Sequence, residues 1–294
     1  MKIWSEYPIK KVKITDKQYP ALLGKISSPP KMLYYRGELK QALFKKSLAV
    51  VGSRRMTRAG KLAVEQLVCP LAAAGVVIIS GFMYGVDSEA HRQCLQSGGT
   101  TVAVFGNGLN IVYPPDNEKL YSQILDNSGL VISEYPAKTK PRLWTYPQRN
   151  RIIAGLSSLG ALVVEAGENS GSLITAKLAI KQKKQVWSVP GPIFSLASTG
   201  TNQLIQSGQA KMALGAEDIL GEKRGTDSAK KLSLNLLEKR IYGALQREPL
   251  DINSLARLIG KEMAELSQLL SLMSLRGLIT EIGGQYFPAR VRRK

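Results

Sequence analysis

The chain has little of the chemistry on which many hydrolases and metalloproteins depend. Its 294 residues contain one histidine, His91, and two cysteines. A histidine-based catalytic triad or a site with several histidine ligands is therefore not expected. Cys69 and Cys94 are not spaced as metal ligands, which predicts two reduced thiols in a cytoplasmic protein. We expect neither a metal nor a cofactor.

Long hydrophobic runs and acidic residues are also scarce. The longest apolar stretch, residues 71–79, is too short to cross a bilayer, and residues 1–13 lack the apolar core of a signal peptide. No membrane association is expected. Only 22 Asp and Glu stand against 41 Lys and Arg, which gives a net charge of +19 at pH 7. This charge is spread over the whole chain and favours a polyanionic partner.

The composition, 44% hydrophobic and 21% charged, is typical of a globular protein with a large core. Residues 1–46 are rich in lysine and have only short apolar runs, so we expect a basic lead-in segment packed on the next domain. Residues 47–220 are predicted to form the main domain. Residues 221–232 are polar and helix-breaking, which is typical of a linker. A small domain over 233–290 and a basic tail over 291–294 follow.

Short apolar runs alternate with helical patterns in the main domain. Unbroken hydrophobic runs rich in β-branched residues are typical of strands buried on both faces, as in a parallel sheet. We therefore predict an α/β fold with a doubly wound, mostly parallel sheet, which would bind ligands beyond the carboxyl ends of its strands. The predicted strands are 48–52, 76–80, 101–105, 130–133, 161–165 and 185–189. The predicted helices are 57–75, 87–97, 117–127, 150–158 and 172–181.

Glycine-rich turns follow four of these predicted strands. Glycine lets backbone amides approach a phosphate closely, and hydroxyl side chains add donors. No turn has the full dinucleotide fingerprint or a P-loop lysine. Glycines in a single turn often serve the turn alone, but four such turns at one edge with arginine beside them predict a phosphate site. The candidate residues are Gly52, Ser53, Arg54, Arg55, Ser80, Gly81, Phe82, Gly85, Gly106, Ser170, Gly171, Ser172 and Thr175.

The segment 146–157 adds a basic cluster to this edge. Arg149 and Arg151 flank Asn150 at the predicted start of a helix, beside the ring of Tyr146. The N–H groups of a helix start attract anions, and guanidinium groups add bidentate donors. A basic anchor with a stacking ring suits a nucleic-acid strand or a nucleotide. The alternative is an arginine pair held in salt bridges to acidic neighbours.

Four titratable residues near these turns have structural interpretations. Asp87 and His91 are one helical turn apart, and we interpret them as a hydrogen-bonded pair that fixes its helix. A catalytic base is the less favoured interpretation, because no activated nucleophile is nearby. Glu165 and Glu168 are the acids near the fifth predicted strand and are candidate partners for the arginines.

Three amphipathic helix patterns and a hairpin in the last part of the chain predict a winged-helix domain. The third helix of such a domain usually enters the major groove of DNA. Here that helix carries Glu262 and Glu265, which argues against sequence-specific reading of a duplex. The predicted helices are 233–246, 251–259 and 262–275, and the hairpin is 278–287.

At these residues the sequence resembles the bacterial DNA-processing protein A family (DprA, also called Smf). The matching motifs occur in the family's order over residues 18–220. They are VGSRRMTRAG, SGFMYGVDSEAH, VFGNGLNIVYP, SEYP, YPQRNRIIAGLS, VVEAGENSGSLITA, and VWSVPG followed by GTNQLIQSG. The resemblance implies a Rossmann-like domain that binds single-stranded DNA without sequence preference and is not an enzyme. It also implies a homodimer that loads the RecA recombinase onto incoming strands in natural transformation.

The resemblance also implies which residues line the family's basic pocket, namely Arg54, the loop 80–87 and the segment 149–151. Three departures from the family pattern concern that region. Tyr146 stands where phenylalanine is usual, which keeps a stacking face. Phe82 and Met83 replace smaller residues. Pro115 stands where some members have a lysine, which removes one possible phosphate contact.

Two other functions stay open at this point. A nucleotide-hydrolysing enzyme of the phosphoribohydrolase type is similar in having a glycine/threonine turn that opens a helix. Such enzymes follow that turn with a catalytic glutamate, whereas this chain has Lys177 in that neighbourhood. A regulator that binds duplex DNA would instead use the winged helix.

Overall fold

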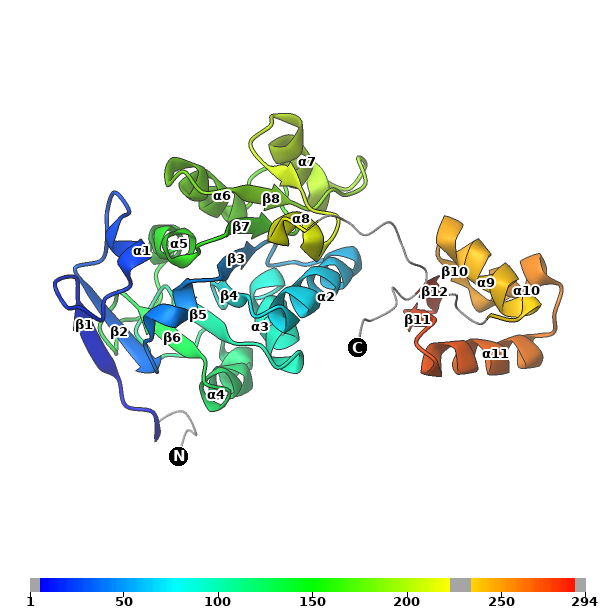
Figure 1. The fold of residues 1–294 in the computed structure, drawn as a ribbon, viewed down its shortest axis with the longest axis horizontal. Helices are drawn as coiled ribbons and strands as arrows, with labels where there is room; N and C mark the ends of the chain where they lie inside the picture. The colour runs from blue at the N-terminus through cyan, green and yellow to red at the C-terminus, as the bar shows by residue number, and fades with distance from the viewer. Residues whose placement is uncertain (1–5, 223–233, 289–294) are drawn as a thin grey trace. The chain divides into compact units, whose positions relative to one another are not determined.

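The structure, a computed structural model, describes residues 6–222 and 234–288. The chain divides into two compact units, residues 1–224 and 225–294 (Figure 1). Each unit has its own hydrophobic core, and each is described by itself.

Nine strands described in the first unit form one sheet. In chain order they are β1 (Lys10–Lys13), β2 (Met32–Gly37), β3 (Ser47–Val51), β4 (Val77–Ser80), β5 (Thr101–Phe105), β6 (Leu130–Ser133), β7 (Gly160–Val163), β8 (Val186–Ser188) and β9 (Lys211–Met212). Their order across the sheet is β1-β2-β6-β5-β4-β3-β7-β8-β9. All neighbours pair in parallel except β1 with β2 and β2 with β6. The chain runs outward from β3 to β6 and then crosses to β7 on the other side of β3, so the predicted doubly wound sheet is confirmed.

Helices cover both faces of this sheet (Figure 1). Successive side chains of a strand point to opposite faces. Ala49 and Val51 of β3 therefore pack in one buried cluster with α5 and α6, whereas Leu48 and Val50 pack in another with α2 and α3. The helices are α1 (Ala21–Gly24), α2 (Arg58–Ala73), α3 (Val86–Gln96), α4 (Glu118–Asp126), α5 (Thr145–Leu156), α6 (Gly171–Lys181), α7 (Thr199–Gln206) and α8 (Ala216–Leu220). Short 3-10 helices are η2 (Gln41–Phe44), η3 (Pro115–Asn117) and η4 (Leu196–Ser198).

The N-terminal segment is part of the sheet, a role that the sequence did not predict. Its strand β2 pairs antiparallel with β6, and β1 pairs with β2. Leu33 and Tyr35 of β2 are buried, but Val12 is the one buried residue of β1. The period-2 pattern of apolar residues by which a strand is recognised is therefore weak in β1.

The second unit has the winged-helix plan that the sequence predicted. Asn235 and Glu238 form a capping box at the start of its first helix, and Asp251 accepts a hydrogen bond from the Ser254 N–H (3.0 Å) at the start of its second. Its elements are α9 (Leu236–Arg247), β10 (Leu250–Asp251), α10 (Ile252–Ile259), α11 (Met263–Leu275), β11 (Ile279–Ile282) and β12 (Gln285–Pro288). Most of the predicted linker and all of the predicted basic tail lie outside the described residues.

Candidate nucleic-acid interface

The glycine turns after β3, β4, β5 and β7 meet at the carboxyl edge of the sheet, because parallel strands end on the same side. The turns after β3 and β4 pack directly on each other. Gly85 has φ 75°, and a Cβ there would lie 2.2 Å from the Ser53 carbonyl oxygen. A Cβ on Gly52 would lie 2.6 Å from a methyl group of Val86. Both glycines are required by this close approach, whether or not a ligand is bound.

Arg54 and Tyr146 lie together at this edge. The exposed Arg54 guanidinium lies over the Tyr146 ring, with its carbon 5.5 Å from the ring centroid, in a cation–π arrangement. The ring of Tyr146 also lies 6.0 Å from the ring of Tyr113, centroid to centroid. A Cβ on Gly106 would lie 2.9 Å from a carbon of the Tyr146 ring, so only glycine lets the ring sit here. Tyr146 is 8% exposed, and the Arg54 guanidinium lies over its ring. The stacking of a base on this ring stays a prediction, and it requires Arg54 to move aside.

Arg149 lies beneath these two side chains. It is 3% exposed and donates to the carbonyl oxygens of Gly81 (2.5 Å) and Val104. A Cβ on Gly81 would lie 2.5 Å from Oδ2 of Asp87 and 2.7 Å from Nη2 of Arg149, so glycine leaves room for both charged groups. Arg149 therefore joins the ends of β4 and β5 and places a positive charge under Tyr146. We call Arg54, Gly81, Asp87, Tyr146 and Arg149 the edge cluster.

The charges of the edge cluster perturb one another. Burial raises the pKa of Asp87 to about 6, while the Arg149 guanidinium opposes that rise. Burial lowers the pKa of Arg149 to about 10, and Asp87 acts in the opposite direction. Asp87 is therefore poised to change its charge near neutral pH, whereas Arg149 stays positive.

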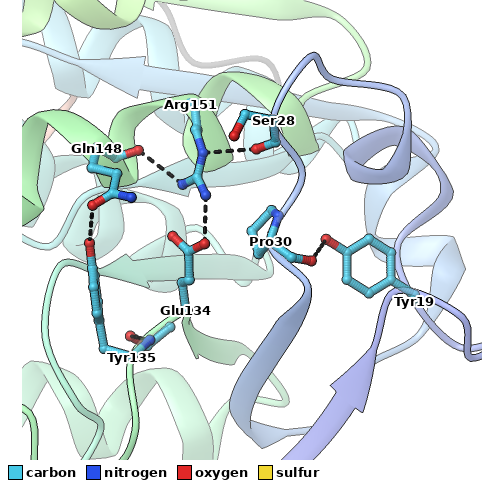
Figure 2. A network of polar contacts seen from close by, with 8 residues as sticks. Tyr19, Ser28, Pro30, Glu134, Tyr135, Gln148 and Arg151 are labelled. Atoms are coloured by element: carbon cyan, nitrogen blue, oxygen red, sulfur yellow. Dashed lines mark hydrogen bonds and ion pairs between the residues drawn. The ribbon is translucent and has the colours of Figure 1, made fainter.

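Arg151 has a different role from Arg149 (Figure 2). Its Nη2 pairs with Oε1 of Glu134 at 2.6 Å, and its Nε and Nη1 donate to the carbonyl oxygens of Ser28 (2.9 Å) and Gln148 (3.1 Å). These bonds tie α5 to the end of β6 and to the N-terminal segment. The salt-bridged alternative that the sequence left open describes Arg151, and its placement among the nucleic-acid contacts stays a prediction.

The start of the helix that carries both arginines was predicted wrongly. α5 begins at Thr145 and not at residue 150, so Arg149 and Arg151 lie in its second turn, past the free N–H groups of a helix start. Pro147 has no N–H to lose and fits the first turn, and the Thr145 hydroxyl donates to the Arg142 carbonyl oxygen at 2.7 Å. The arginines therefore act through their side chains alone.

Phe82, another predicted contact residue, belongs to the core. Its side chain is fully buried, and its ring lies 4.8 Å from that of Phe105, centroid to centroid. Its backbone is left-handed (φ 63°), which an apolar residue rarely adopts and which this packing holds in place. Only its backbone can line the turn after β4.

The first residues of α6 reach the same edge from the other side of α5. The Asn150 side chain donates to the Gly171 carbonyl oxygen at 3.4 Å, and Ser170 caps the helix by accepting from the Ser172 N–H. Ser172 and Thr175 are buried, whereas Gly171 is exposed, with nothing within 4 Å of a Cβ added to it. This helix start is open on its outer side.

The start of α2, by contrast, is filled by the protein's own anion. The Glu165 carboxylate accepts hydrogen bonds from the Thr57 N–H (2.9 Å) and from the Thr57 hydroxyl. A Cβ on Gly60 would lie 2.4 Å from the Glu165 carboxyl carbon. The prediction that Glu165 holds an arginine is therefore wrong, and this carboxylate occupies the position at which a helix start binds phosphate.

The predicted pairing of Asp87 with His91 is also wrong. His91 is fully buried, and its Nδ1 lies 2.6 Å from Oγ1 of Thr101. Burial lowers its pKa to about 3, so the imidazole is neutral at physiological pH. The sequence placed both residues on one helix face, but the ring turns toward β5 and the carboxylate toward Arg149.

Over residues 6–222 and 234–288, no group of three or more His, Cys, Asp or Glu side chains is arranged to hold a metal ion. Cys69 and Cys94 are free thiols. No helix in the same described residues is long and apolar enough to cross a membrane.

Comparison with known proteins gives a consistent result for both units. Residues 10–224 match the family model of DNA recombination-mediator protein A, and residues 226–285 match that of the DprA winged helix domain. The chain belongs to the DprA family. It is 42% identical over 209 residues to the DNA processing protein DprA of Streptococcus pneumoniae, covering 71% of this chain and 72% of that protein. It is 38% identical over 219 residues to the Bacillus subtilis DNA processing protein DprA, covering 74% and 73%.

Two solved DprA structures share the fold of the first unit. The X-ray structure of the S. pneumoniae protein superposes with a TM-score of 0.67 at 39% identity, covering 75% of this chain and 76% of that one. That of Helicobacter pylori superposes with a TM-score of 0.65 at 29% identity, covering 75% and 97%. The H. pylori structure is described for its single-stranded DNA binding mode.

The sequence analysis did not identify two residues at this edge of the sheet as site residues, namely Tyr113 and Asp87. Tyr113 lies against Tyr146 and is 38% exposed, yet it was one residue of a motif used only for the resemblance. Asp87 was interpreted as the partner of His91 rather than of Arg149. Asp87 lies at the start of the helix that follows a glycine turn. This position could have indicated that its side chain lies at the carboxyl edge of the sheet.

Proposed function

We propose that this DprA-family chain binds single-stranded DNA without sequence preference. The observation that carries the proposal is the exposed Arg54 guanidinium over the Tyr146 ring, with the buried charge of Arg149 beneath. A guanidinium is a strong donor to phosphate, and a neighbouring aromatic surface suits an unstacked base. The net charge of +19 adds long-range attraction for a polyanion. The binding mode described for the H. pylori relative supports the same ligand.

The edge cluster favours a single strand over a duplex for a geometric reason. Arg54 and Gly81 lie in turns at the ends of strands, whereas Asp87, Tyr146 and Arg149 lie on α3 and α5 but are buried. The cluster therefore presents no exposed helix face that could enter a groove. In a duplex the bases are stacked inside, so a ring at the cluster has nothing to meet, whereas the bases of a single strand can be splayed out. Glu265 of α11 in the winged helix pairs with Lys261, which lies just before that helix (2.9 Å), and this leaves little net positive charge there for a major groove.

The enzyme alternative has less support. Lys177 is exposed on α6, and Glu165, a buried acid close to that region, is engaged with Thr57. No described side chain of the edge cluster is a serine, cysteine or lysine nucleophile beside a base. A binding protein accounts for the same residues without requiring a nucleophile.

The proposal extends to the role implied by the family. In that role a homodimer of this chain, bound to single-stranded DNA in the cytoplasm, loads the RecA recombinase onto incoming strands during natural transformation. Membership of the DprA family supports the RecA-loading role. The edge cluster supports only the strand binding that this role requires. It is tested separately, by following RecA filament assembly on strands coated with a single-strand-binding protein, with and without this chain.

Strand binding is tested by titrating labelled oligo-dT, a mixed-sequence strand and a duplex at several salt concentrations. If about four phosphates are neutralised, the slope of log affinity against log salt should be roughly −3, at about −0.7 per phosphate. Arg54→Ala should weaken binding of every strand alike and make the slope shallower by about 0.7, since phosphate contacts carry no base information. Duplex bound as tightly as strand, or an affinity independent of salt, would refute the proposal.

A matched control is Arg240→Ala, because Arg240 is exposed on α9 of the second unit and carries the same charge. Its loss should reduce affinity only through the overall charge and leave the salt slope close to that of the wild type. Equal effects of the two substitutions would mean that net charge, and not the edge cluster, binds the strand.

A further inference from the structure

The Tyr146 hydroxyl is a buried polar group without a partner. Tyr146 is 8% exposed, and its hydroxyl makes no hydrogen bond within the part of the chain that the structure describes. Other buried tyrosines differ: the Tyr19 hydroxyl donates to the Pro30 carbonyl oxygen at 2.8 Å (Figure 2), and that of Tyr121 donates to Leu109 at 3.2 Å. Buried polar groups are nearly always hydrogen-bonded, because an unpartnered one destabilises the fold. Buried atoms of His91, Glu134, Gln182 and Trp187 also lack a partner in the described residues, but the Tyr146 hydroxyl is the one in the edge cluster, beside the exposed Arg54.

The surroundings of this hydroxyl are those of an anion site. The charged groups that act on it are the guanidiniums of Arg149 and Arg54, and Tyr113 is the other neighbouring phenol. Burial raises the pKa of Tyr146 to about 12, so the hydroxyl keeps its proton and is a donor at neutral pH. This protonated hydroxyl, near two positive charges, lacks an acceptor that carries negative charge.

We propose that the Tyr146 hydroxyl donates a hydrogen bond to a phosphate oxygen of the bound strand. This inference rests on the proposed function and adds a specific contact to it. A phosphate oxygen is an acceptor only, which matches a donor beside two guanidiniums, whereas base edges present donors as well. The aromatic ring alone would not make this contact, so a phenylalanine at this position would lack it.

The proposed hydrogen bond predicts that removing the hydroxyl changes fold stability and strand affinity in opposite directions. In the free protein the hydroxyl is buried without a partner, so removing it should stabilise the fold. In the complex the hydroxyl is bonded, so removing it should weaken binding. A hydroxyl with a purely structural role would not give this combination, because its removal would lower stability and leave affinity unchanged.

The test is Tyr146→Phe, with Tyr19→Phe as the matched control. Both tyrosines are buried, at 8% and 5% exposed, but only the Tyr19 hydroxyl has a partner in the protein. We expect Tyr146→Phe to weaken binding about 3- to 10-fold, equally for oligo-dT, oligo-dC and a mixed strand, and to raise the Tm of the free protein. The salt slope should not change, since a neutral hydroxyl releases no counterion. Tyr19→Phe should lower the Tm and leave affinity unchanged.

Three results would overturn the inference while leaving the proposed function intact, provided that the wild type binds single strands. The first is unchanged affinity in Tyr146→Phe. The second is a loss confined to one base composition, which would indicate a contact with a base edge. The third is a lower Tm in Tyr146→Phe, which would mean that the hydroxyl is already bonded in the free protein. A wild type that binds no single strand at any salt would instead overturn the proposed function and this inference with it.

Discussion

The two sides of α5 use the same residue type for different purposes. On one side Arg151 pairs with Glu134 and with two carbonyl oxygens, and this network joins α5 to the N-terminal segment (Figure 2). On the other side Arg149 pairs with carbonyl oxygens and faces Asp87, whose pKa burial raises to about 6. The network side pairs its guanidinium with a carboxylate, although Oε2 of Glu134 has no partner among the described residues. The edge cluster holds an exposed guanidinium, a carboxyl group with a raised pKa and an unpartnered hydroxyl. The exposed cation and the raised carboxyl pKa distinguish the edge cluster as the candidate binding side.

The largest effect is expected from removing Arg149, the buried arginine of the edge cluster. Arg149→Met should destabilise the protein by about 3–5 kcal/mol, because it leaves Asp87 buried without its counter-charge and two carbonyl oxygens without their donor. Urea unfolding measures the loss. The substitution should also weaken binding of oligo-dT at temperatures where the variant is folded. A loss of stability near zero would mean that Asp87 and Arg149 do not interact as described.

Removing Arg151 from the network side should lower the stability of the fold without changing strand affinity. Arg151→Met should cost about 2–3 kcal/mol, less than Arg149→Met because Arg151 and Glu134 are partly exposed. Strand affinity and its salt slope should match those of the wild type when measured on folded protein. The double variant with Glu134→Gln should recover part of the lost stability, since neither charge is then left alone. A shallower salt slope in Arg151→Met would show that Arg151 also contacts the strand.

The contrast also separates what the sequence can predict from what it cannot. Unbroken apolar runs in residues 47–220 predicted the doubly wound sheet, because strands buried on both faces leave no polar alternation. Strands β1 and β2 were missed, since β2 forms by pairing with β6 and β1 by pairing with β2. Tertiary pairing of this kind leaves little trace in local sequence.

The same limit holds within the site. The glycine turns were predicted to meet at one edge from strand topology alone, and they do. The division of labour between Arg149 and Arg151 was not foreseen, because it depends on the true start of α5 and on partners far apart in sequence, Val104 and Glu134. Phe82 was misplaced for a related reason: glycine neighbours indicate a turn but do not tell which way its side chain points.

The smallest expected effect is a pH dependence that belongs to the edge cluster alone. Asp87 faces Arg149, the Met83 N–H, Ser80 and Arg54, and its pKa lies at about 6 instead of 3.8. Because the folded pKa is the higher one, protonated Asp87 stabilises the fold below pH 3.8, and this contribution is lost as the pH rises through about 6. A bound phosphate adds negative charge nearby and should raise this pKa further, so binding should take up a proton.

Affinity for oligo-dT, whose bases do not titrate in this range, should therefore rise as the pH falls from about 7.5 to about 5.5. A one-unit rise in the pKa on binding corresponds to about a ten-fold limit, and we expect roughly 3- to 10-fold. His91, with a pKa of about 3, stays neutral and does not contribute. Asp87→Asn should flatten the profile at the level that the wild type reaches at low pH, whereas Arg151→Met should keep the wild-type profile. A profile that survives in Asp87→Asn would assign the proton to another group and place Asp87 outside the binding site.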